Sequence, residues 1–232
     1  MGIDVSRLRA FLNRPGLEGP QQLRGYVPCA LTSGGSRNYT GYDAPDGYVP
    51  MGVSGVTVAT GCDLGQQTAQ SLDGVGRDLL RKLAPYLGKR KRAALAALHA
   101  LPLALTGMEA DRVDTVVMSR YIRLSAARYD RDAGAEAFAS LPWQAQAVIH
   151  SLLFQRGTGS PKNYPHTWKA LVGRDWSGAS ERLRNGALWT GYRERRRLEG
   201  ELLREVARWL LRGRMWGKPS PRRPRCSAEC WA

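Results

Sequence analysis

The sequence has few groups that would fix a fold by cross-linking. Its 232 residues contain only four cysteines, Cys29, Cys62, Cys226 and Cys230, which is too few for a disulfide scaffold. Cys226 and Cys230 have no other Cys or His near them in sequence, so a pair of free thiols is favoured over a zinc site. No apolar run approaches the ~18 residues that a membrane-spanning helix needs, which predicts no membrane span. The first residues also lack the continuous apolar segment of a secretory signal, so we expect a chain made in the cytoplasm that other machinery delivers.

Acidic residues are scarce relative to basic ones. The chain has 20 Asp and Glu against 35 Lys and Arg, a net charge of +15. Such a charge indicates a polyanionic partner, either nucleic acid, anionic lipid or an anionic cell-wall polymer. The hydrophobic fraction of 43% and the seven tryptophans exclude a disordered chain. They allow one well-buried domain or two small ones.

The order of sequence patterns predicts a small strand-and-loop lobe followed by a helical body. Asp4 is expected to cap a first short helix over residues 5–12, whose apolar side chains recur at helical spacing. Residues 25–54 are rich in Gly, Pro, Ser, Asp and Tyr, which predicts loops and short strands. Residues 56–60 alternate as a strand does, and the segments after Gly65 carry apolar stripes typical of helices.

Several residues indicate where these helices begin. One apolar stripe is predicted from Leu72, Val75, Leu79 and Leu83, and Asp111 is expected to cap a helix that follows it. Pro142 suits a first helical turn, Asp175 a cap, and Thr190 the start of the last helix. From residue 211 the chain is rich in arginine, glycine and proline, which predicts a flexible basic tail.

Two carboxylates in the first third of the chain are candidates for catalysis. Glu18 follows the first helix in G-L-E-G, and Asp63 follows the strand in T-G-C-D-L-G-Q. Carboxylates from separate elements that face one cleft suit acid-assisted cleavage of a glycosidic bond. One would be kept protonated by partial burial, and the other would stay ionised to orient water or stabilise positive charge. Thr57, just upstream on the strand, could help to position that water.

Each of these residues also has an ordinary structural interpretation. Glu18 could be a solvated surface residue, Asp63 a turn residue or N-cap, and Thr57 simply a β-branched strand residue. The run from Arg195 to Arg197 predicts a solvated helix face with some affinity for polyanions. The other polar and aromatic candidates are expected to be structural, in the core or in a cleft wall: His99, His150, His166, Trp143, Trp168, Trp176 and Trp189.

Three segments of the first lobe carry a more specific pattern. They are Glu18-Gly19 with Leu23-x-Gly25-Tyr26-Val27-Pro28, then Ser54-Gly55-Val56-Thr57, then Gly61-x-Asp63-Leu64-Gly65-Gln66. The helical part adds Leu141-Pro142, Trp168-x-x-Leu171 and Tyr192-x-x-Arg195-Arg196-x-x-Glu199. Together they resemble the lysozyme-like toxin domain of pesticin and its phage-lysozyme relatives over residues 5–210. The resemblance implies an α+β, mostly α, phage-lysozyme-like fold, with a small β-lobe near the N-terminus packed on a helical body. The catalytic domain would span 1–210 and the tail 211–232.

The resemblance also implies an activity. Such proteins are muramidases, which hydrolyse the β-1,4 bond between N-acetylmuramic acid and N-acetylglucosamine in peptidoglycan. Glu18 would be the general acid, and Asp63 and Thr57 would hold the attacking water or stabilise the transition state. Tyr26, Thr60 and Gln66 would contact the substrate, and no metal or cofactor is expected. The protein would act in the periplasm or cell wall as a phage endolysin or an antibacterial effector, delivered by a holin or a secretion system.

Peptidoglycan glycan strands are the expected partner, and an immunity or inhibitor protein is a further candidate. We expect a monomer with no requirement for nucleic acid. One alternative is a basic protein that binds nucleic acid or another polyanion, although no helix-turn-helix, zinc-finger or RNA-binding motif is present. Another is an inactive wall-binding relative. The spacing from Glu18 to Thr57 is long and G-Y-V-P occurs twice, at 25–28 and 47–50, so Ser33 could stand where the acid is expected. The assignment to Glu18 keeps both the acid and its spacing to the first copy.

Overall fold

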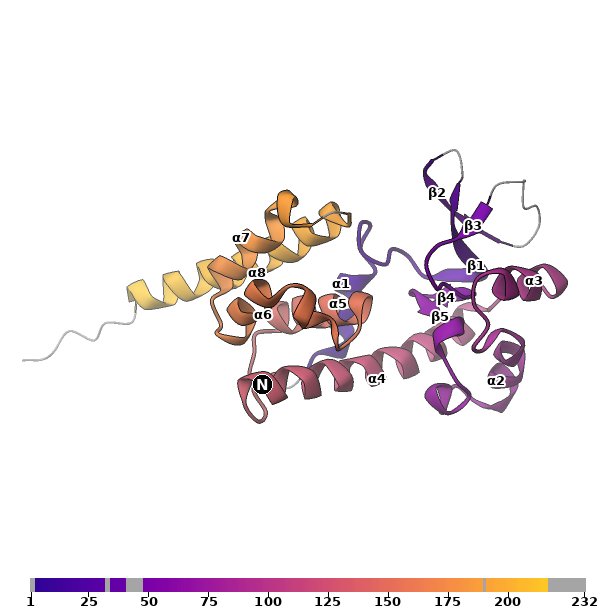
Figure 1. The fold of residues 1–232 in the computed structure, drawn as a ribbon. Helices are drawn as coiled ribbons and strands as arrows, with labels where there is room; N and C mark the ends of the chain where they lie inside the picture. Colours follow the sequence, from indigo (N-terminus) through magenta and orange to yellow (C-terminus); the bar gives the residue numbers. More distant parts are fainter. Residues whose placement is uncertain (1–2, 32–33, 41–47, 190, 217–232) are drawn as a thin grey trace, which may run out of the picture.

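The computed structural model describes residues 3–31, 34–40, 48–189 and 191–216. A small antiparallel sheet with short helices forms one lobe, and a group of longer helices forms the other (Figure 1). Helix α4 (Gly107–Ala133) runs from the first lobe into the second. This is the α+β, mostly helical arrangement that the sequence predicts.

The sheet is built around one long strand. β1 (Gln22–Leu31) pairs with β2, β3 and β4, and β5 pairs with β4, so the order is β2-β1-β4-β5 with β3 also on β1. The shorter strands are β2 (Ser36–Tyr39), β3 (Tyr48–Pro50), β4 (Thr57–Ala59) and β5 (Cys62–Asp63). β1 is longer than the predicted loops and short strands, and its buried face includes Gly25, Val27 and Cys29. A Cβ at Gly25 would lie only 3.0 Å from Leu103 Cβ. Close packing against Leu103, and not a turn, therefore accounts for the glycine at this position.

The helices of the first lobe cover the sheet. They are η1 (Leu64–Gln66), η2 (Gln70–Leu72), α2 (Arg77–Leu83), η3 (Ala84–Tyr86) and α3 (Arg92–Ala100). The four residues of the predicted stripe, Leu72, Val75, Leu79 and Leu83, are all buried, but they do not belong to one helix. Gly74 and Gly76, with φ of 101° and 92°, break the segment into η2 and α2.

Helix α4 begins earlier than predicted. Thr106 Oγ1 accepts a hydrogen bond from Glu109 N at 3.2 Å, and the Glu109 carboxylate accepts one from Thr106 N at 2.8 Å. This reciprocal capping box satisfies two backbone donors at once, so it starts the helix five positions before the expected cap, Asp111. Asp111 instead lies inside α4 and binds Arg9 at 2.6 Å.

The second lobe consists of α1 (Val5–Leu12), α5 (Trp143–Arg156), η4 (Ser160–Asn163), α6 (Pro165–Val172), α7 (Trp176–Arg184), η5 (Gly186–Leu188) and α8 (Arg193–Trp216). The predicted caps at Asp4 and Asp175 are confirmed by bonds of 3.0 Å to Arg7 N and 2.9 Å to Gly178 N. α5 begins directly after Pro142. Thr190, the predicted start of the last helix, lies outside the described residues. The predicted tail begins at residue 211 inside α8, and its part from 217 onward is also outside them.

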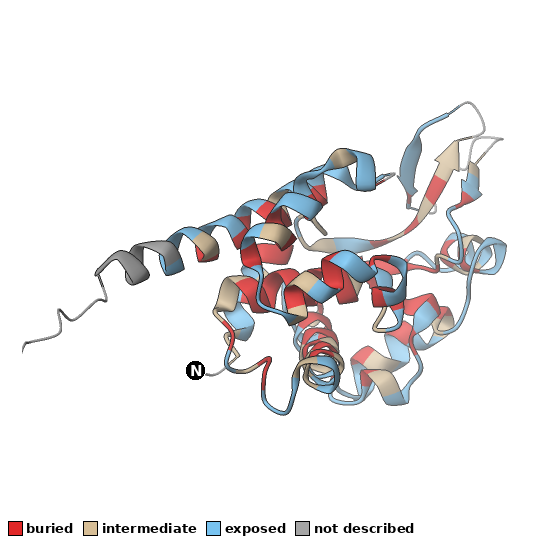
Figure 2. Ribbon diagram, turned by 60° about the vertical axis from the view of Figure 1, so that its left-hand side comes forward, coloured by how far each residue is buried: buried red, intermediate tan, exposed pale blue. Residues whose placement is uncertain are grey.

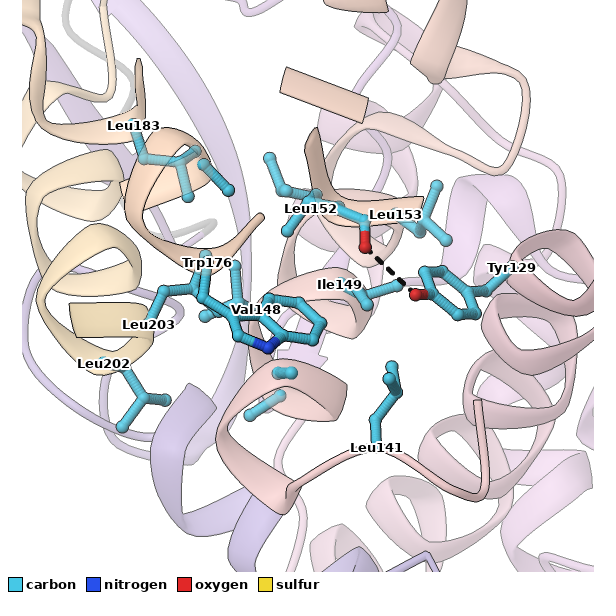
Figure 3. Packing of buried hydrophobic residues seen from close by; sticks show 14 of the residues in the cluster. Tyr129, Leu141, Val148, Ile149, Leu152, Leu153, Trp176, Leu183, Leu202 and Leu203 are labelled. Atoms are coloured by element: carbon cyan, nitrogen blue, oxygen red, sulfur yellow. Dashed lines mark hydrogen bonds between the residues drawn. The ribbon is translucent and has the colours of Figure 1, made fainter. Parts of the chain in front are cut away.

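Each lobe has its own hydrophobic core, and α4 contributes to both. Val113 and Val117 of α4 pack in the sheet lobe, whereas Ile122 and Tyr129 pack in the helical lobe. Figure 2 shows α5 as the most completely buried helix of the second lobe, with exposed faces on α7 and α8 outside it. Figure 3 shows side chains of α5 lying between Trp176 on one side and Tyr129 on the other, and the Tyr129 hydroxyl donates to Leu171 O at 3.0 Å.

None of the helices in the described part of the chain is long and apolar enough to cross a membrane. Cys29 and Cys62 are buried free thiols, and Cys226 and Cys230 lie outside the described residues. Trp168, Trp176 and Trp189 are buried, in agreement with their expected place in the core.

Candidate active site

A cleft of about 600 Å³ lies between the two lobes. Its walls come from the loop after α1, the β4–β5 turn with η1, the middle of α4, the end of α5 and the start of α8. Both predicted carboxylates, Glu18 and Asp63, line it. Each belongs to a different wall, so the cleft brings together residues that are far apart in the sequence.

Three of the predicted residues form a row across the sheet. Thr57 of β4 pairs with Tyr26 of β1 on one side and with Asp63 of β5 on the other. Side chains of residues that face each other in neighbouring strands project from the same face of the sheet. Tyr26, Thr57 and Asp63 therefore share one face. Thr57 is buried at 5% exposure, and its hydroxyl lies 3.5 Å from Gly55 O.

Two glycines hold the Asp63 carboxylate. Its Oδ1 accepts hydrogen bonds from Gly55 N at 3.0 Å and from Gly65 N at 2.8 Å. A Cβ at Gly55 would lie 2.6 Å from that same oxygen and 2.5 Å from Gly65 Cα, so only glycine fits there. Asp63 is thus also the N-cap of η1, as its structural interpretation predicts. Burial raises the pKa of Asp63 above its ordinary value, although the Gly65 and Gly55 amides, Arg90 and Gln66 oppose the rise.

Glu18 reaches the same turn from the opposite lobe. Its backbone N–H donates to Leu12 O at 3.0 Å, which folds the loop back on the end of α1. Its Oε2 lies 2.7 Å from the place where a Cβ on Gly61 would stand. Gly61 has φ of 74° and comes two residues before Asp63. Burial raises the pKa of the Tyr26 hydroxyl to about 12, and the negative charges of Glu18 and then Asp63 contribute to this rise.

Arg195 belongs to the Tyr192-x-x-Arg195-Arg196-x-x-Glu199 motif, but its contact with Glu18 could not be predicted from the sequence. The sequence predicts a solvated helix face over 195–197, but Arg195 is 4% exposed, Arg196 is fully buried, and only Arg197 is open to solvent. The prediction was wrong for the first two because α8 packs against α5 and α7 along this face. Arg195 Nη1 lies 2.6 Å from Glu18 Oε1, which fixes the position of the Glu18 carboxyl group.

Arg195 is itself held in place by Ser151 and Glu199. Its Nη2 donates to Ser151 Oγ at 2.9 Å and to Ser151 O at 3.2 Å, and its Nε lies 3.4 Å from Glu199 Oε1. Ser151 Oγ donates to the same Glu199 oxygen at 2.6 Å. The i to i+4 spacing of Arg195 and Glu199 was visible in the sequence, but their shared burial was not. The outcome is a guanidinium with a fixed direction toward the cleft.

Residues 11–177 match the model of the pesticin family, described as a bacterial toxin homologue of phage lysozyme. The chain belongs to the pesticin family. Comparison with individual curated proteins gives no match. The matched range contains Glu18, Thr57 and Asp63 and ends before Arg195. Homology with phage lysozyme makes this a lysozyme-like glycosidase family directed at the cell wall.

The pesticin-family chain places the two remaining predicted residues differently. Gln66 lines the cleft, and its amide donates to Val53 O at 3.2 Å. Thr60 is not brought to the cleft wall: it is 2% exposed and donates through Oγ1 to Asp114 Oδ2 at 2.8 Å. The reason is local, because Ala59 has φ of 51°, which ends the strand alternation before Thr60.

Aromatic side chains add apolar surface to this pesticin-family cleft. Tyr121 and Phe154 line it with ring centroids 5.0 Å apart, and Tyr192 stands at its edge with 59% exposure. Flat apolar rings of this kind suit the faces of sugar rings. Among the residues that the structure describes, no group of three or more His, Cys, Asp or Glu is placed to hold a metal ion.

Proposed function

We propose that this protein is a muramidase, which hydrolyses the β-1,4 bond between N-acetylmuramic acid and N-acetylglucosamine in peptidoglycan. The observation that carries the proposal is that Glu18 and Asp63 line opposite walls of one interlobe cleft, with Glu18 packed against Gly61. Two carboxylates on opposite walls are the minimum machinery for glycosidic cleavage. Membership of a lysozyme-homologous family supports the same substrate.

Each carboxylate has a distinct role in the proposed reaction. Glu18 acts as the general acid and gives a proton to the glycosidic oxygen as the bond from that oxygen to the anomeric carbon breaks. A water molecule adds to the anomeric carbon, and its proton passes to Asp63 in its ionised form or, where Asp63 only stabilises the developing positive charge, to the Glu18 carboxylate. Thr57 lies beside Asp63 in the sheet, where its hydroxyl would help to hold the water. Arg195 positions Glu18.

The rest of the molecule fits a cell-wall substrate. Gln66, Tyr121 and Phe154, which line the cleft, would bind the glycan strand, and Tyr26, which lies beside Thr57 in the sheet, would add a further contact. The net charge of +15 would attract the protein to the anionic wall. We infer action in the periplasm or cell wall, as an endolysin or antibacterial effector, after delivery by a holin or a secretion system.

The test is lysis of chloroform-treated Gram-negative cells, followed by turbidity and by identification of the new reducing sugar. The parent protein should clear the suspension and produce glycan fragments whose new reducing ends are N-acetylmuramic acid. Glu18→Gln should lower the rate by about 10² to 10⁴, a typical contribution of a general acid, and Asp63→Asn should also be severely impaired. Glu201→Gln, an exposed change on α8 outside the cleft, should lyse like the parent.

Two outcomes would contradict the proposal. Lysis that survives Glu18→Gln would remove Glu18 from the reaction. Absence of lysis by the parent, combined with strongly salt-dependent DNA binding, would favour the polyanion-binding alternative instead.

A further inference from the structure

A second hollow, of about 430 Å³, lies between α4 and the segment that contains η2. Its lining is mostly polar and includes Thr68, Gln70, Ser71 and Asp73 on one side and Arg120 and Arg123 on the other. None of these residues is used by the proposed hydrolysis. The hollow nevertheless lies directly beside the cleft.

Gln67 forms the wall between the two spaces. It is 4% exposed and lines the cleft, and its Oε1 accepts hydrogen bonds from Arg120 Nη1 at 3.1 Å and from Ser71 Oγ at 2.9 Å. The next residue of α4, Tyr121, lines the cleft, and its ring centroid is 5.8 Å from the Arg120 guanidinium. A substrate that occupies the cleft could therefore extend a substituent past Gln67 into the hollow.

The charges in the hollow are not neutralised internally. Arg120 and Arg123 are one helical turn apart, and within the described part of the chain neither has a carboxylate at ion-pairing distance. By contrast, Arg128 of the same helix is paired with Asp132 at 2.8 Å. Guanidinium groups bind carboxylates through paired hydrogen bonds, so two of them in one hollow without a carboxylate partner favour an acidic ligand. Asp73 adds one acceptor that could bind an ammonium group.

We propose that this hollow is a subsite for the peptide stem of peptidoglycan, with Arg120 and Arg123 binding its carboxylates. The inference rests on the proposed function, because that substrate carries a short acidic peptide on its muramic acid residues. A stem that contains a diamino acid also offers an ammonium group to Asp73. The subsite would let the protein distinguish wall glycan from amino-sugar polymers that have no peptide.

Calorimetry with two soluble fragments tests this. The first is N-acetylglucosaminyl-N-acetylmuramic acid that carries a tetrapeptide with diaminopimelic acid, and the second is the same disaccharide without peptide. The parent should bind the first more tightly. Arg120→Gln/Arg123→Gln should weaken that binding about tenfold, in line with the loss of charge-assisted hydrogen bonds, and leave the second unchanged. Arg204→Gln/Arg208→Gln removes the same charge from an exposed face of α8 and should change neither.

Equal parent affinity for the two fragments would overturn the subsite, and so would equal losses in the two double variants, which would indicate general electrostatic attraction. The result is separable from the lysis test, since binding needs no catalysis. Stem-dependent binding without lysis would leave the subsite in place and make the protein a wall-binding relative without muramidase activity.

Discussion

The contact between Glu18 and Gly61 gives the sharpest prediction. Changing Gly61 to alanine adds a Cβ 2.7 Å from Glu18 Oε2 and 3.2 Å from its Cδ, closer than such contacts are tolerated. Because Gly61 has φ of 74°, an L-residue there also costs about 1–2 kcal/mol of stability. The Glu18 carboxyl group must move, and a misplacement of about 1 Å can lower a rate about 10²-fold. We therefore expect Gly61→Ala to stay folded but to lose about two orders of magnitude in lysis rate.

Gly88→Ala is the matched control for this change. Gly88 has a similar φ of 69°, but a Cβ there would have nothing within 4 Å. Urea denaturation should show comparable stability losses for the two variants, and the turbidity assay should show the rate loss only for Gly61→Ala. Parental lysis rates from well-folded Gly61→Ala would refute the assignment of Glu18 to the reacting site. Equal rate losses in both variants would attribute the effect to backbone strain.

Three further predictions concern stability. Asp114→Ala should lower the free energy of unfolding by about 3 kcal/mol in chemical denaturation, because the buried carboxylate, 2% exposed, binds Arg9, Gln21 and Thr60. A decrease of less than about 1 kcal/mol would show that these contacts contribute little to stability. Burial, then Arg195, lowers the pKa of His150 to about 3 from an ordinary 6.5, so the unfolded chain takes up the proton first and stability falls as pH drops below ~6.5. Between pH 6.5 and 5 the loss should be roughly 2 kcal/mol, and His150→Asn should remove that slope; an unchanged slope would show that other groups cause it. Thr106→Ala should cost about 1 kcal/mol by breaking the α4 capping box, measured by thermal unfolding, and no change in Tm would count against the cap.

The sequence predicted the local features well because their causes are local. Asp4 and Asp175 cap their helices through neighbouring amides, and the motif around Asp63 carries the glycines that the carboxylate needs. The helix start at Thr106 has an equally local cause, since its capping box is present in the sequence as T-x-x-E. Asp111, five residues later, is also a favoured N-cap residue type, so the sequence alone leaves the start of this helix ambiguous.

The features that were not predicted depend on packing between distant segments. Arg195 and Arg196 resemble a charged surface run in the sequence, and only the position of α5 against α8 makes them interior. Thr60 is the exception with a local cause: it leaves the expected face because Ala59 adopts a left-handed conformation, which the alternation of residue types does not reveal. The hollow beside Arg120 likewise exists only because η2 folds back along α4.

Helix α4 has a consequence for how the protein unfolds. Its first half belongs to one core and its second half to the other, so neither lobe can lose its packing without exposing part of the same 27-residue helix. The two lobes should therefore unfold together rather than in sequence, and amide hydrogens near Met118 should exchange only with global opening. Since Glu18 lies on one lobe and Asp63 on the other, the two carboxylates face each other only when both lobes are folded and packed together. Half of the molecule, however well folded, would hold only one of the two acids.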